Sequence, residues 1–154
     1  MDPLLVFAVI TLVTCIVVTA VVFASWRYRP TVWAGDIGLP RTTDPVGGAV
    51  VAAIVVLIML GGAVAASVAT IDEFGFVGAA IAGWALVVVF SLWDFLIIDW
   101  LVFIGLKPSW FHLDGMENAP QIYEWQHHAK ESIPGIFLGI PIGVIAAGIA
   151  ALAN

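Results

Sequence analysis

Four long runs of apolar residues constrain the fold of this chain more than any other feature of its sequence. The hydrocarbon core of a bilayer is about 30 Å thick, and an α-helix needs about 20 apolar residues to cross it. Runs of that length cover residues 3–26, 46–70, 77–104 and 133–153, the third ending between Ile98 and Leu106. A backbone inside lipid has no water to bond with, so each run must be helical. The sequence therefore predicts an all-α polytopic membrane protein, a four-transmembrane-helix bundle forming a single membrane domain over residues 1–154.

The composition excludes several other classes of protein. Hydrophobic residues make up 62% of the chain and charged residues only 10%, which is far from the balance of an ordinary soluble domain. With five basic residues and no basic cluster, the chain lacks a surface that could follow a phosphate backbone, so nucleic acid is not an expected partner. Cys15 is the single cysteine, which excludes an internal disulfide framework. The lipid bilayer is the partner that the composition predicts.

The basic residues predict how the runs are oriented. All five fall in the connections 27–45 and 107–132, namely Arg27, Arg29, Arg41, Lys107 and Lys130. The connection between the second and third runs contains Asp72 and Glu73 and no base. Cytoplasmic loops carry an excess of Lys and Arg, so both basic connections are expected in the cytoplasm. The sequence thus predicts a multi-pass protein of the cell (inner) membrane with both termini outside the cytoplasm.

A ridge of small residues predicts how the last run packs. Its members recur every four residues and are Gly135, Gly139, Gly143, Ala147 and Ala151. Residues at this spacing lie along one side of a helix, and small side chains there let neighbouring helices approach closely. We expect the ridge to pack within the chain. The alternative is contact with a second copy in a homo-oligomer or with other membrane subunits.

Two acidic residues, Asp94 and Asp99, interrupt the third run. An ionisable group within a span is rare and marks a proton or ligand site by default. In an α-helix, five residues at about 100° each place the two carboxylates about 140° apart, so they are not expected to share a narrow face or to hold a metal by themselves. The structural alternative is that Asp99 pairs with Arg27 or Arg29 and that Asp94 bonds to a neighbouring helix or to an indole N–H.

The connection 107–132 is the other segment rich in titratable groups. Asn118 followed by Gln121, with Pro120 in the first turn, is typical of a helix start and predicts a short interfacial helix from Ala119 to Glu131. One face of that helix gathers two carboxylates and two imidazoles, at Glu124, His127, His128 and Glu131.

Glu-x-x-His at helical spacing is how helix bundles supply metal ligands, but di-metal sites need two such segments and this chain has one. The pattern is therefore compatible with one divalent metal such as zinc, completed by His112 or Asp114. The alternative is a solvated polar face on an interfacial helix whose Tyr123 and Trp125 enter the headgroup layer.

Residues 84–140 resemble a pattern found in small bacterial four-helix integral membrane proteins of unassigned function. The likeness rests on Trp93, Asp94, Asp99, Trp100, Pro108, Gly115, Met116, Glu117, Tyr123, His128, Pro134 and Gly135. The resemblance implies that the acidic third span and the following connection form one unit, and it implies no activity.

Three functional hypotheses follow. The small size, the glycine ridges and the lack of phosphate-loop, nucleophile-elbow or dinucleotide motifs favour an accessory or assembly component of a larger membrane complex over an enzyme. The second hypothesis is an oligomeric channel or carrier that moves a proton or small solute past Asp94. The third is a membrane-embedded metal-dependent enzyme that uses Glu124, His127 and His128.

Overall fold

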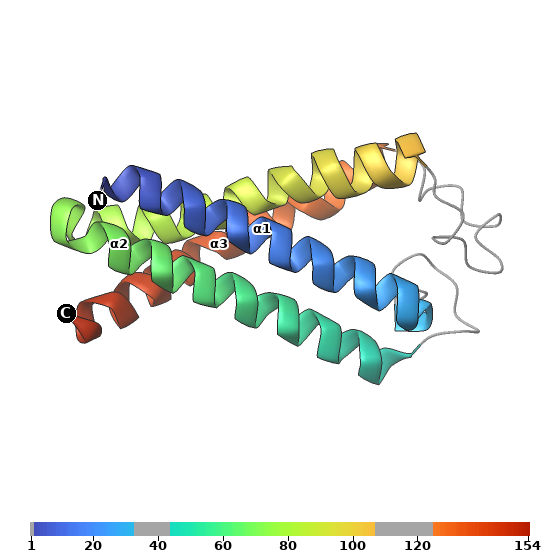
Figure 1. Cartoon of the computed structure of the whole chain (residues 1–154), viewed down its shortest axis with the longest axis horizontal. Helices are drawn as coiled ribbons and strands as arrows, with labels where there is room; N and C mark the ends of the chain where they lie inside the picture. The colour runs from blue at the N-terminus through green and yellow to red at the C-terminus, as the bar shows by residue number, and fades with distance from the viewer. Residues whose placement is uncertain (1, 33–43, 107–124) are drawn as a thin grey trace.

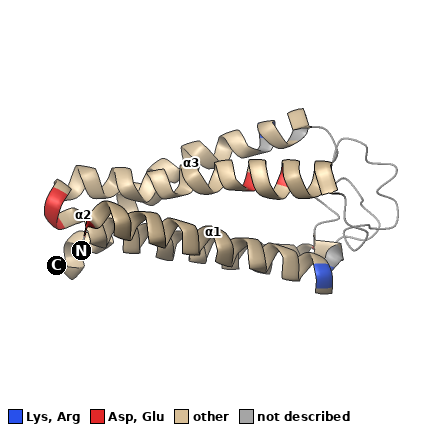
Figure 2. Cartoon of the chain, turned by 45° about the horizontal axis from the view of Figure 1, so that its top comes forward, with Lys and Arg blue, Asp and Glu red and all other residues tan. Residues whose placement is uncertain are grey.

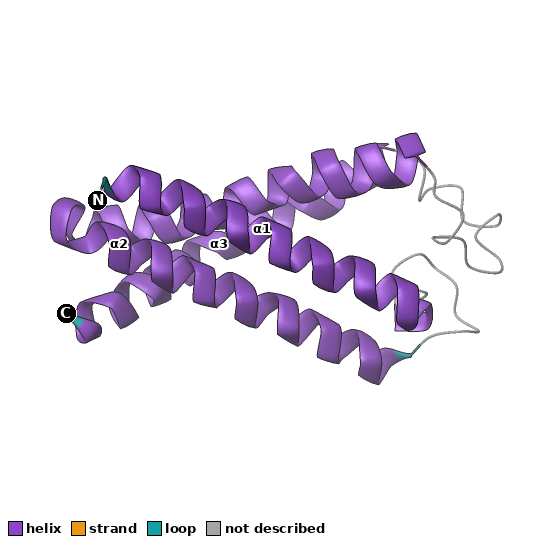
Figure 3. Cartoon of the chain, viewed as in Figure 1, coloured by secondary structure: helices purple, strands orange, loops and turns teal. Residues whose placement is uncertain are grey.

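The computed structural model describes residues 2–32, 44–106 and 125–154, without the side chains of Pro30, His127 and Glu131. Within these ranges every regular element is a helix (Figure 3). The elements are α1 (Pro3–Tyr28), the 3-10 turn η1 (Pro30–Val32), α2 (Pro45–Trp93), the π-helix η3 (Asp94–Leu106) and α3 (Trp125–Ala153). Three helical segments are long and apolar enough to cross a membrane: Pro3–Tyr28, Pro45–Leu106 and His128–Ala153. The predicted all-α class is therefore confirmed for the part of the chain described.

Helix α2 reverses direction at Gly75. This residue has φ 65° and ψ −173°, a conformation that is essentially restricted to glycine because a Cβ would meet the backbone. Figure 1 shows the chain turning back here, which divides α2 into a first arm (residues 45–74) and a second arm (residues 76–93). The Ser67 hydroxyl donates to the Ala79 carbonyl at 2.9 Å and ties the arms together. Helix continues through Asp72 and Glu73, which were expected to lie in a connecting loop, because one glycine provides the whole reversal.

The two arms of α2 run alongside α1 and α3 (Figure 1). Both termini and the turn at Gly75 lie at one end of the molecule. Figure 2 shows the acidic residues of that turn at the same end and the basic residues of α1 at the other. The turn is thus acidic, whereas the opposite end carries both signs, because Asp44 pairs there with Arg29 at the end of α1.

Close approach at glycines holds the second arm of α2 to α3. A Cβ on Gly139 would lie 3.0 Å from the Trp84 ring, and one on Gly143 would overlap the Ala80 carbonyl oxygen. The Trp84 indole N–H also donates to the Ile136 carbonyl across this interface at 3.1 Å. The part of the ridge formed by Gly139 and Gly143 thus packs within the chain, as expected.

A substitution at Gly75 tests the reversal. Gly75→Ala places a side chain in a glycine-only conformation and should lower the free energy of unfolding by about 1–3 kcal/mol. The control is Gly61→Ala, since Gly61 is exposed on the first arm and a Cβ there meets nothing within 4 Å. Thermal unfolding in detergent, followed by circular dichroism, measures both. Equal midpoints for the two variants would contradict this account of the turn.

Candidate functional site

The helical register of η3 brings Asp94 and Asp99 to one side. This segment of 13 residues is a π-helix, in which hydrogen bonds join residues five apart instead of four. Residues five apart in a π-helix therefore lie on nearly the same side, one turn from each other, as residues four apart do in an α-helix. The expectation that the two carboxylates lie about 140° apart is wrong, because it assumed α-helical geometry.

Asp99 pairs with His128 between η3 and α3. The His128 Nδ1 lies 3.2 Å from the Asp99 Oδ1, and the two side chains are only 12% and 14% exposed. The sequence did not predict this contact, because the contact depends on α3 beginning at Trp125, before the expected start of the last span. The α-helix α3 runs unbroken from Trp125 to Ala153 with Pro134 and Pro141 inside it, whereas His128 was expected on a separate interfacial helix.

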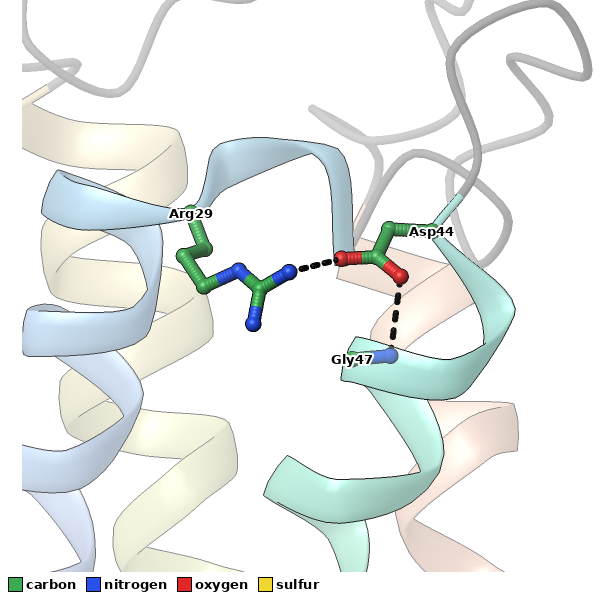
Figure 4. A network of polar contacts seen from close by, with 3 residues as sticks. All are labelled: Arg29, Asp44 and Gly47. Carbon is green, nitrogen blue, oxygen red and sulfur yellow. Dashed lines mark hydrogen bonds and ion pairs between the residues drawn. The ribbon is translucent and has the colours of Figure 1, made fainter.

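Arg29, one of the two partners expected for Asp99, has a different role. Its guanidinium lies 2.7 Å from the Asp44 carboxylate, whose other oxygen accepts the Gly47 N–H at 2.9 Å (Figure 4). Asp44 thus caps the first turn of α2 and holds the end of α1 beside it. The pairing of Asp99 with Arg29 is wrong, since the acid that Arg29 meets is the helix cap.

Aromatic rings cover the Asp99–His128 pair. Phe103 of η3 stacks on the His128 imidazole with ring centroids 6.1 Å apart, and Trp26 of α1 meets Phe103 edge to face at 5.5 Å. Trp26 and Phe103 are themselves buried, so α1, η3 and α3 meet around the pair. Electrostatic contacts in such a water-poor environment are stronger than at the surface.

Asp94 completes the group. It lies one π turn before Asp99, on the same side of η3. The indole N–H of the preceding residue, Trp93, donates to the Thr19 hydroxyl at 3.0 Å, so that indole binds α1 and not Asp94. We refer to Asp94, Asp99 and His128 as the Asp–Asp–His site.

Of the predicted metal ligands, the structure describes the side chain of His128. His112, Asp114 and Glu124 lie outside the described residues, as do the side chains of His127 and Glu131. The remaining one, His128, is turned towards Asp99 and is not on a solvated face. Among the residues that the structure describes, no three His, Cys, Asp or Glu side chains are grouped so as to hold a metal. A zinc site therefore stays a prediction.

The geometry suits proton exchange within the bundle. An imidazole with a proton on Nδ1 donates to the Asp99 carboxylate, and that contact sets which ring nitrogen carries the proton. A second carboxylate, Asp94, lies on the same side of η3 as Asp99. The site thus combines an imidazole with two acids, and the Asp99 and His128 side chains are so little exposed that an unpaired charge there is costly.

Comparisons with family models, with curated proteins and with solved structures find no match to this chain. The likeness of residues 84–140 to small bacterial membrane proteins stays a resemblance.

A double-mutant cycle tests the buried pair. Asp99→Ala and His128→Ala should each destabilise the protein almost as much as both changes together, because either single change leaves the other polar side chain buried without its partner. We expect a coupling energy of about 1–3 kcal/mol between the two positions in unfolding experiments.

The control cycle uses Arg29→Ala and Asp44→Ala, whose side chains are 66% and 24% exposed. Its coupling should stay below about 1 kcal/mol, since solvent screens exposed ion pairs. A coupling at Asp99 and His128 no larger than this control would contradict the buried pair.

Proposed function

We propose that this chain crosses the cell membrane four times, with both termini outside the cytoplasm. The apolar segment Pro45–Leu106 has 62 residues and would extend about 90 Å as one straight helix, far more than the roughly 30 Å that one crossing needs. Its reversal at Gly75 supports two crossings in place of one. Large apolar side chains are exposed on every long helix, among them Leu57, Val77 and Leu138, as suits a surface in contact with lipid.

The orientation is open to direct measurement. On a Cys15→Ser background, single cysteines at Tyr28 and Lys130 should react with an impermeant maleimide from the cytoplasmic side, and cysteines at Glu73 and Asn154 from the opposite side. The Cys15→Ser protein without added cysteine gives the background. Labelling of positions 28 and 73 from the same side of the membrane would refute the four-span topology.

We further propose that the protein is a proton-linked membrane channel or carrier, in which Asp94 and the Asp99–His128 pair bind the proton. The observation that carries this proposal is the Asp99–His128 contact, buried at 3.2 Å between two apolar helices with Asp94 beside it. Intramembrane acids and histidines that pair with one another inside a bundle are typical of proton relays and ion pathways. A purely structural pair of Asp99 and His128 would not need a second carboxylate. The presence of Asp94 on the same side of η3 therefore favours a role in proton exchange over a purely structural role.

The accessory hypothesis is the second candidate, and one observation still favours it. Exposed small residues form two pairs at four-residue spacing on the first arm of α2, Ala49 with Ala53 and Gly61 with Ala65, and a neighbouring helix could approach closely at either pair. The exposed Leu57 lies between the pairs. The ridge on α3 no longer supports docking in the same way, because Gly139 and Gly143 pack against the second arm. A chain of this size needs copies of itself to form a carrier, so contact along the first arm is compatible with both candidates.

Proton flux into vesicles separates the two. The purified protein, reconstituted in vesicles that contain a pH-sensitive dye, should conduct protons under an applied potential. Asp94→Asn and Asp99→Asn should lower that rate roughly tenfold or more, because each removes a proton-binding group from the pathway. Asp72→Asn is the control, since Asp72 is exposed at the opposite end of the molecule. Flux no higher than in protein-free vesicles, or equal flux in all variants, would reject the proton-linked function and leave the accessory role.

A further inference from the structure

We propose that η3 is a two-state element that assembles and separates the Asp–Asp–His site by changing its hydrogen bonding between residues five apart and residues four apart. This inference rests on the proposed function, since it names how the same site is regulated. It concerns a single segment, Asp94–Leu106, which begins at one acid and includes the other.

The first observation is the length and place of the π-helix. Such helices are rare and mostly limited to one turn within an α-helix, frequently at functional sites. Here the π register extends over 13 residues and starts at Asp94, directly after the α-helical second arm. The change of register thus coincides with the first residue of the site.

The second observation is that the buried side chains of η3 follow the π register. Counting from Asp94, the next inward positions are Ile98 with Asp99, and then Val102 with Phe103, at steps of four to five residues. Two of these side chains make specific contacts, Asp99 with His128 and Phe103 with both His128 and Trp26. Tertiary packing therefore supports the π register at each turn.

The third observation is an opposing force within the same segment. The π register places Asp94 and Asp99 on one side of the helix, and two carboxylates on one side repel when both are ionised. Return to the α register would place them about 140° apart and relieve that repulsion, at the cost of the Asp99 or Phe103 contacts. Two discrete arrangements with opposing advantages are what a switching element requires.

The segment is also anchored so that a change of register has to move its far end. The Trp93 indole bonds to Thr19 of α1 just before η3 starts, while the second arm packs closely on α3. A change of register consequently turns residues such as Leu101 around the helix axis and leaves the second arm in place. The two carboxylates then no longer face His128 together.

Distances between spin labels test this directly, on a Cys15→Ser background in lipid vesicles. One label pair joins position 101 on η3 to position 133 on α3, both exposed. The control pair joins position 92 on the second arm to position 133. We expect two distance populations for the 101–133 pair and one for the 92–133 pair.

Deletion of Leu96, an exposed residue between the two acids, provides the decisive variant. It brings Asp94 and Asp99 to a separation of four residues, so that α-helical bonding keeps both on one side. The 101–133 distances should then collapse to one population, whereas Leu96→Ala, which keeps the chain length, should retain two. A single population in the unaltered chain, or two populations after the deletion, would overturn the proposal.

The spin-label distances measure the conformation of η3 and do not depend on proton flux. The experiments can therefore reject the switch and the proton-linked function independently. Two populations with no proton flux would reject the proton-linked function alone. Proton flux with a single 101–133 population would reject the switch alone.

Discussion

The reversal of α2 at Gly75 is the constraint on which the rest of the structure depends. It folds an apolar stretch of 62 residues back on itself, so that the second arm lies beside the first and becomes available to α3. The specific contacts of α3 described above use that second arm or its continuation, η3. The close approach of Gly139 and Gly143, the bond from Trp84 to Ile136 and the Asp99–His128 pair would all be lost if residues 45–106 formed one straight helix.

Several polar side chains in this bundle bond to another element or to their own helix backbone, whereas the buried Thr11 hydroxyl has no partner among the described residues. Ser67 bonds across the two arms, and the Trp93 indole reaches Thr19 on α1. Thr14 and Thr70 bond to carbonyls four residues earlier in their own helices. The Asp–Asp–His site differs from these contacts, because it brings together two carboxylates and an imidazole, whereas the hydroxyls and the indole of those contacts are neutral.

Several features of the site could be predicted from the sequence, and others could not. The two acids were identified because charges in an apolar run are conspicuous, and the helical segment that carries His128 was expected from its spacing. Their meeting was missed for two physical reasons. Hydropathy does not reveal a change from α to π bonding, which decides whether residues five apart share a side. The pairing of Asp99 with an arginine was expected only because both were predicted at the same level of the membrane. In the structure, Arg29 pairs with the cap residue Asp44 instead.

By itself, the sequence determined what a lipid environment would impose on these residues. Long apolar runs must be helical, glycines every four residues make a surface on which another helix can pack, and charges belong at the ends. The tertiary structure decided which side chains meet: that one glycine reverses α2, that α3 extends back far enough to bring His128 to Asp99, and that η3 turns both acids the same way. Periodicity and hydropathy are properties of one segment at a time, whereas a contact between segments depends on the rotation and offset of both.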